Sequence, residues 1–173
     1  PNIVPDRAVG TFYVRAADGI ALAELKTRVK NCFEAGALAA GCDVEIQWAL
    51  GDYLEIKDCW PLAERYKANA ESLGRSFFPL EKIPTTGAGS TDMGNVSHRV
   101  PSIHPMIACA PPHVVIHNPE FAKYAGSETG DAAVLDGAKA LAMTAIDVMT
   151  DDQLLKDARD QFNETADLSA QAV

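Results

Sequence analysis

The sequence predicts an α/β fold, in which helices pack against short strands. In the first third of the chain, two segments of alternating apolar and polar residues, 8–16 and 44–48, flank a segment with helical periodicity. Further along, a short apolar run at 103–110 precedes a long helical pattern at 128–149. Of the 173 residues 47% are apolar, which is enough to build the core of one domain or of two small ones.

The first predicted module comprises residues 1–57. Its first strand, 8–16, has one apolar face and one polar face, and Arg15 lies on the polar face. Asp18 is a suitable N-cap for the helix that follows, and Gly41 is expected to end that helix. With the second alternating segment, these elements make a β-α-β unit, which is half of a small α+β sandwich.

The second predicted module comprises residues 58–173. A helix is expected from Pro61, which is tolerated in a first turn, to a stop at Gly74. The apolar run at 103–110 has the composition of a strand buried on both faces, and many small residues would let the long helix after it lie close to a sheet. The sequence at 150–153 has the form of a capping box, which predicts a last helix that runs to about Phe162.

The charge and composition exclude several classes of partner. The formal net charge is −9, with no basic run, which argues against nucleic acid or an anionic membrane as a partner. No apolar stretch approaches the roughly 20 residues that cross a bilayer, and no signal peptide is recognisable. The expected location is cytoplasmic, and the four scattered cysteines are expected to be reduced.

Asn2 and Arg15 form the first candidate site. An arginine on the polar face of a strand is most often a solvated surface residue. The functional alternative is that the planar guanidinium of Arg15 binds a carboxylate and that the Asn2 amide adds a hydrogen bond.

A glycine-rich loop at residues 89–98 forms the second candidate. It belongs to a long irregular segment, 75–101, and loops of that length in a compact domain are usually functional. A structural turn explains most of its composition. The alternative is an active-site wall in which Asp92 orients a neighbour, while His98 or His104 contacts substrate.

His117 is the third candidate. A single histidine at the end of a strand is more often a packing or capping residue than a ligand. The order of elements favours the functional interpretation, because a glycine-rich loop, a buried strand, this histidine and a long helix follow one another. In open α/β sheets, ligands bind at the carboxyl ends of strands, where His117 would lie.

Taken together, these motifs resemble the aminoacylase and carboxypeptidase family of two-zinc metallopeptidases. They look closest to its amidohydrolase branch, which contains aminoacylase-like dipeptidases and aminobenzoyl-glutamate hydrolase. The resemblance covers nearly the whole chain in order, although Ile116 stands where many relatives have a small residue. The motifs that carry it are Asn2-Ile3-Val4-Pro5, Val14-Arg15, Gly89-Ser90-Thr91-Asp92-Met93-Gly94-Asn95-Val96-Ser97-His98, Pro101-Ser102-Ile103-His104-Pro105 and Ile116-His117.

The resemblance implies a zinc-exopeptidase-like α/β catalytic domain interrupted by a ferredoxin-like lid and dimerisation domain. Residues 1–57 would be the second half of the lid, and residues 58–173 the C-terminal portion of the catalytic domain. His117 would be a metal ligand, Asn2 and Arg15 would hold the carboxylate of the substrate, and Asp92 would shape the loop. The other metal ligands and the general base have no counterpart here, so we expect the chain to be an inactive C-terminal fragment.

The implied parent enzyme hydrolyses an amide bond in N-acyl or N-aroyl amino acids or small dipeptides. It would use two divalent metal ions, with zinc as the expected metal and manganese or cobalt as alternatives. It would also form a homodimer through the lid. Its partners would be an amide substrate with a carboxylate and the missing N-terminal part of the same protein, which could remain attached to a nicked chain. The rival hypothesis is a non-catalytic dimerisation or ligand-binding module.

Overall fold

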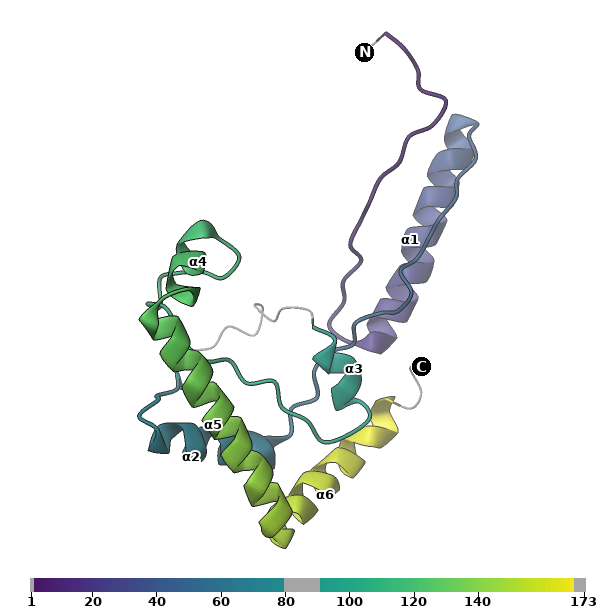
Figure 1. Ribbon diagram of the computed structural model, residues 1–173. Helices are drawn as coiled ribbons and strands as arrows, with labels where there is room; N and C mark the ends of the chain where they lie inside the picture. Colours follow the sequence, from purple (N-terminus) through teal and green to yellow (C-terminus); the bar gives the residue numbers. More distant parts are fainter. Residues whose placement is uncertain (1, 80–90, 170–173) are drawn as a thin grey trace.

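A computed structural model describes residues 2–79 and 91–169, and the side chains as far as residue 165 (Figure 1). Over these ranges the chain is helical or irregular, with no residue assigned to a strand. The helices are α1 (Gly19–Ala40), α2 (Trp60–Ser72), α3 (Met93–Ser97), α4 (Pro119–Ala125), α5 (Glu128–Thr150) and α6 (Asp152–Ser169).

The first module is built around α1, whose predicted ends are confirmed. The Asp18 side chain accepts a hydrogen bond of 2.8 Å from the Ala21 N–H, so it caps the first turn. At the other end Gly41 has φ 66°, a left-handed conformation that glycine adopts without steric cost. The preceding chain and the chain that follows α1 both run along the helix as extended segments (Figure 1).

The two strands predicted in this module, 8–16 and 44–48, lie in those extended segments and form no ladder. Their contacts with α1 are made by side chains: the Phe12 and Phe33 ring centroids are 5.1 Å apart, and Lys26 Nζ lies 4.9 Å from the Trp48 ring centroid. The β-α-β unit, and with it the α/β fold class, therefore stays a prediction.

The second module has its core between α2 and α5. Tyr66 and Ala70 of α2 are buried against Ala140 of α5, with Leu73 and Ile103 at the edge of the cluster. The predicted position of Pro61 in the first turn of α2 is confirmed. Small residues on the inner face of α5 allow the two helices to approach closely.

Polar contacts fix α2 to α5 and to the start of α6. The Asn69 amide donates to Thr144 Oγ1 and to an Asp147 carboxylate oxygen, at 3.1 and 2.9 Å. Arg65 Nη2 lies 2.9 Å from Asp151 Oδ2, and Arg75 Nη2 lies 2.8 Å from a carboxylate oxygen of Asp136 on α5. These contacts hold the helices in register around the small apolar core.

The capping box predicted at the last helix is shifted by one residue. Asp151, and not Thr150, caps α6, because its Oδ1 accepts from the N–H groups of Gln153 and Leu154 at 3.1 Å each. The Thr150 hydroxyl instead donates to Ile146 O at 2.9 Å, so it closes α5. The helix also continues past the predicted end at Phe162 as far as Ser169.

The apolar run 103–110 is irregular and covered on one side. Ile107 lies over Gly137 of α5, where a Cβ would make ordinary van der Waals contact with Ile107 Cδ1 at 3.5 Å, whereas Met106 is 73% exposed. A strand buried on both faces would need a second covering layer, so this element also stays a prediction. None of the helices in the described ranges has the length and apolar character that crossing a membrane requires.

Candidate functional site

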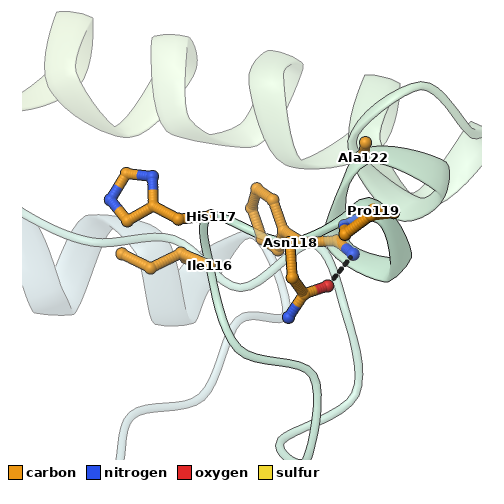
Figure 2. A pocket seen from close by; sticks show the side chains of 6 residues that line it. Ile116, His117, Asn118, Pro119 and Ala122 are labelled. Atoms are coloured by element: carbon orange, nitrogen blue, oxygen red, sulfur yellow. Dashed lines mark hydrogen bonds between the residues drawn. The ribbon is translucent and has the colours of Figure 1, made fainter. Parts of the chain in front are cut away.

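His117 lies immediately before α4, where the chain turns sharply into the helix. Asn118 is the N-cap of α4, and its Oδ1 accepts from the N–H groups of Glu120 and Phe121 at 2.9 Å each. Pro119 then occupies the first turn, where its missing N–H costs nothing. Figure 2 shows the imidazole of His117 projecting from this turn, away from the capping bond.

The backbone at His117 is unusual. Its φ is 64°, and among the described residues other than glycine it is the one with a positive φ. A residue with a Cβ costs about 1 kcal/mol or more in this conformation, and such positions cluster at functional sites. The strain favours a functional role for this side chain, because a glycine or asparagine would suit the turn better.

A shallow hollow surrounds the imidazole (Figure 2). It is open to solvent and mostly apolar, and His117 is its one ionisable residue. Its lining residues are Ile116, His117, Asn118, Pro119, Phe121 and Ala122.

The lining of the hollow supplies one side chain that can bind a metal ion, but it does not make a complete metal site. His117 is exposed, so its ring is accessible to a ligand. Within residues 2–79 and 91–165, however, no three histidine, cysteine or acidic side chains lie together in a way that could hold a metal ion. A catalytic zinc ion takes about three protein ligands, so this part of the chain could contribute one donor to a site completed elsewhere.

Asn2 and Arg15 lie in the other module. Both are exposed, in the extended segment that runs along α1, and this segment is well separated from α4 (Figure 1). Asn2 and Arg15 are also 13 positions apart along this extended segment, so the structure brings the two predicted carboxylate-binding residues neither to each other nor to the predicted metal ligand.

Asp92 and the start of its loop are partly described. Gly89 and Ser90 lie outside the described residues. Asp92 stands at the N-cap position of α3, is exposed, and makes no capping bond to the helix. Its Oδ1 lies 3.4 Å from the Thr91 hydroxyl, which is the neighbour it contacts.

The two histidines predicted to contact substrate are in opposite environments. His104 is exposed on the irregular segment after α3. The side chain of His98 is only 8% exposed, and its Nε2 lies 3.0 Å from the backbone oxygen of Glu55 and 3.4 Å from Glu55 Oε1. Its Nδ1 is buried without a hydrogen-bond partner. His98 therefore points toward the segment that joins the two modules.

Two ionisable groups of the second module are perturbed by burial. Burial raises the pKa of the Cys59 thiol, and a hydrogen bond with the Leu62 backbone opposes this effect. Burial also raises the pKa of Tyr66, against the opposing charge of Arg75. Both groups belong to the packing around α2, so neither is a candidate for chemistry at His117.

The residues missed by sequence reasoning are Asn95 and Ser97, which bind the segment that joins the two modules, and Glu55, which lies within that segment. Asn95 and Ser97 belong to the loop interpreted as an active-site wall or a turn. Their contacts with residues about 40 positions away leave no local pattern. The sequence signal for these contacts was the glycine at position 94. The structure gives its reason, because a Cβ there would lie 1.9 Å from Leu54 O.

Along nearly its whole length, the chain is similar to dipeptidases. It is 37% identical over 162 residues to the Xaa-Arg dipeptidase of Homo sapiens and 36% identical over 162 residues to the Xaa-Arg dipeptidase of Mus musculus. Each alignment covers 94% of this chain but 37% of the relative, so the chain spans little more than a third of the length of these curated relatives. No family model matches the chain. The similarity supports the resemblance to a peptidase family at the level of a dipeptidase.

Proposed function

We propose that this chain is the C-terminal part of a metal-dependent amidohydrolase that cleaves small dipeptides or N-acyl amino acids. The observation that carries the proposal is the 37% identity to an Xaa-Arg dipeptidase over 94% of the chain. The strained backbone of His117, at the position that the motif order selects, is the structural support. In this proposal the chain belongs to the amidohydrolase branch of the two-zinc metallopeptidases.

His117 would supply one ligand to a pair of divalent metal ions, zinc first and manganese or cobalt as alternatives. When bound, such ions polarise the amide carbonyl and lower the pKa of water. The left-handed backbone at His117 sets the direction of its Cα–Cβ bond, and the cap at Asn118 holds the turn that carries it. The remaining ligands and the general base would come from the part of the protein upstream of this chain.

Arg15 and Asn2 would hold the free carboxylate of the substrate, through a planar guanidinium and an amide N–H. The segment that carries them is extended and well separated from α4 in this structure, so they would reach the same substrate through a rearrangement of that segment with domain closure, or from a second subunit. His104, which is exposed, and His98 are further candidates for substrate contact, and Asp92 would shape the loop beside them.

The name of the relatives points to a dipeptide with a C-terminal arginine, and we propose the same substrate class here. The net charge of −9 fits a cationic substrate, because an acidic protein raises the local concentration of cations. Hydrolysis of Xaa-Arg should therefore weaken with rising ionic strength more than hydrolysis of the matching Xaa-Leu dipeptide.

Association would accompany this function. The first module leaves several large apolar side chains exposed, including Phe12 at 66% and Leu50 at 111%. Apolar surface of this kind marks an interface. We assign it to the other half of the lid and to a homodimer contact.

The test is His117→Ala in the full-length protein. We expect metal content to fall and turnover to drop by at least about a hundredfold, the loss typical of a disturbed metal site. His113, exposed on the same segment, provides the matched control, and His113→Ala should leave both quantities unchanged. Full metal content and activity in His117→Ala would overturn the assignment.

The second candidate is a non-catalytic dimerisation or ligand-binding module. The observation that favours it is the set of large apolar side chains that the first module exposes, among them Phe12 and Leu50. Isothermal titration of the 173-residue chain with zinc separates the two ideas. We expect weak or no stoichiometric uptake by the chain alone and tight uptake by the full-length protein, whereas weak uptake by both would favour the module.

A further inference from the structure

The segment that joins the two modules, residues 52–60, has an unusual set of hydrogen bonds. Residues 52–59 are extended and Trp60 is the first residue of α2, yet six backbone polar groups of this segment are bound by side chains and not by another strand. These groups are Asp52 O, Leu54 N, Glu55 O, Lys57 N, Asp58 O and Trp60 N. We call residues 52–60 the joint.

Helix α3 binds one side of the joint. The Asn95 side chain donates to Asp52 O at 2.9 Å and accepts from Leu54 N at 3.3 Å, so a single amide replaces a neighbouring strand. Ser97 is buried, and its hydroxyl oxygen accepts from Lys57 N at 2.9 Å. His98 Nε2 lies 3.0 Å from Glu55 O.

Close approach of α3 to the joint depends on Gly94. A Cβ on this residue would lie 1.9 Å from Leu54 O and 2.8 Å from its carbonyl carbon. These are backbone atoms, so they could not move aside cheaply. Any larger residue at Gly94 would push α3 off the joint.

The start of α1 binds the joint as well. Glu55 Oε2 accepts from the Gly19 N–H at 3.0 Å, and Lys26 Nζ lies 2.8 Å from Asp52 Oδ2. Because Glu55 also contacts His98, one carboxylate links the first turn of α1 to the end of α3. In Figure 1, α3 lies beside the N-terminal end of α1.

Helix α6 binds the far end of the joint. The Gln161 side chain accepts from Trp60 N at 2.9 Å and donates to Asp58 O at 3.1 Å, which repeats the arrangement made by Asn95. Lys57 Nζ donates to Thr165 O at 2.7 Å. The joint is thus bound by α1 and α3 near its start and by α6 at its end.

We propose that α3 is a latch that fixes the direction in which the first module leaves the second, with Asn95 and Ser97 as positioning residues. The extended joint has no ladder partner within the described residues, so these side chains replace one, and their loss would free the joint to bend. The consequence for catalysis rests on the proposed function: the latch would set where Arg15 and Asn2 stand relative to His117.

The latch itself is tested by hydrogen exchange in the 173-residue chain, with Asn95→Ala compared against Asn163→Ala. Asn163 is exposed on α6 and provides a matched loss of one amide. We expect the Leu54 amide to exchange roughly fivefold faster in Asn95→Ala, as the loss of one hydrogen bond implies. Amides in the α2–α5 core should be unchanged. Equal exchange at Leu54 in both variants would overturn the latch.

Gly94→Ala provides a second variant with a larger expected effect. It should speed exchange at both Leu54 and Lys57, because the added Cβ displaces the whole of α3. If this variant fails to fold, Ser97→Ala takes its place and should act at Lys57 alone. Unchanged exchange at Lys57 in Ser97→Ala would also contradict the latch.

The effect of the latch on catalysis is measured in the full-length protein that carries Asn95→Ala. We expect KM for Xaa-Arg to rise several-fold with metal content unchanged, and a smaller effect on the amidated Xaa-Arg-NH2, which lacks the carboxylate. An unchanged KM in an active enzyme would overturn the positioning role. Absence of hydrolysis in the unmodified full-length protein would refute the proposed function and leave the exchange result standing.

Discussion

The two modules of this chain differ in how they are held together. None of the α1 residues is buried, and its neighbours are extended segments that contact it through a few side chains. In contrast, α2, α5 and α6 enclose a core in which Tyr66, Ala70 and Ala140 are at most 3% exposed. The second module therefore has a buried apolar cluster, whereas α1 of the first module has no buried residue.

The difference arises because the apolar residues of the two modules have different packing partners. The second module has helices that pair with one another, so small residues on α5 can pack on Tyr66. The first has one helix between two extended segments, and a β-α-β unit buries its sheet only when further strands or another layer cover it. If residues 1–57 are the predicted half of a sandwich, exposed apolar residues are what this module should show.

The largest predicted effect is a difference in the free energy of unfolding when one large aromatic side chain is truncated in each module. Tyr66→Ala should lower the free energy of unfolding by about 3–4 kcal/mol, because it removes a buried ring and leaves a cavity. Phe33→Ala in α1, where the ring is 37% exposed, should cost less than about 1 kcal/mol. Urea unfolding monitored by circular dichroism measures both changes. Equal losses would show that the first module also has a cooperative core.

Several elements were predictable because their signals are local. The N-cap at Asp18 and the left-handed stop at Gly41 are single-residue features, and both are confirmed. The end of α6 was predicted too early, because Lys57 holds Thr165 from a position 108 residues away. Strand pairing depends on partners far along the chain or outside it, so 8–16 and 44–48 could not be settled from their own pattern.

The candidate site was predictable in part for the same reason. The order of motifs selected His117, and its positive φ gives that choice a physical basis. The sequence groups His98 with His104, because the first ends the glycine-rich loop and the second follows it closely. Only the folded chain shows that the first is buried at the joint and the second is exposed. Contacts with residues about 40 positions away carry no periodic signal, so the joint was not predictable.

A smaller effect concerns the pH dependence of the second module. The Leu154 N–H, followed by Arg65, lowers the pKa of Asp151 from its usual range. A carboxyl whose pKa is depressed on folding contributes stability above its unfolded pKa of about 3.9, and loses it as pH falls through the folded value. Asp151→Asn should keep the cap but remove the charge, so it should be less stable than wild type at pH 7.

The difference between wild type and Asp151→Asn should shrink below about pH 4 and vanish once both carry a neutral group. Unfolding curves in urea at several values between about pH 2 and pH 7 measure it. Asp152→Asn, which removes the same charge one residue along, serves as the matched control. A difference that stays constant with pH would show that Asp151 acts through its cap geometry alone.

The smallest effect is a difference in the alkylation rate of cysteines between the two modules, and it involves no change in stability. All four cysteines are unpaired, and Cys32 and Cys42 of the first module are exposed, whereas Cys59 at the start of α2 is buried. Burial raises the pKa of Cys59, so less of it is thiolate at about pH 8, and access is also blocked. Alkylation by iodoacetamide, followed residue by residue by mass spectrometry, should label Cys32 and Cys42 well before Cys59. Fast labelling of Cys59 in the native chain, with the other two slow, would mean that the second module opens more readily than the first and would reverse the comparison.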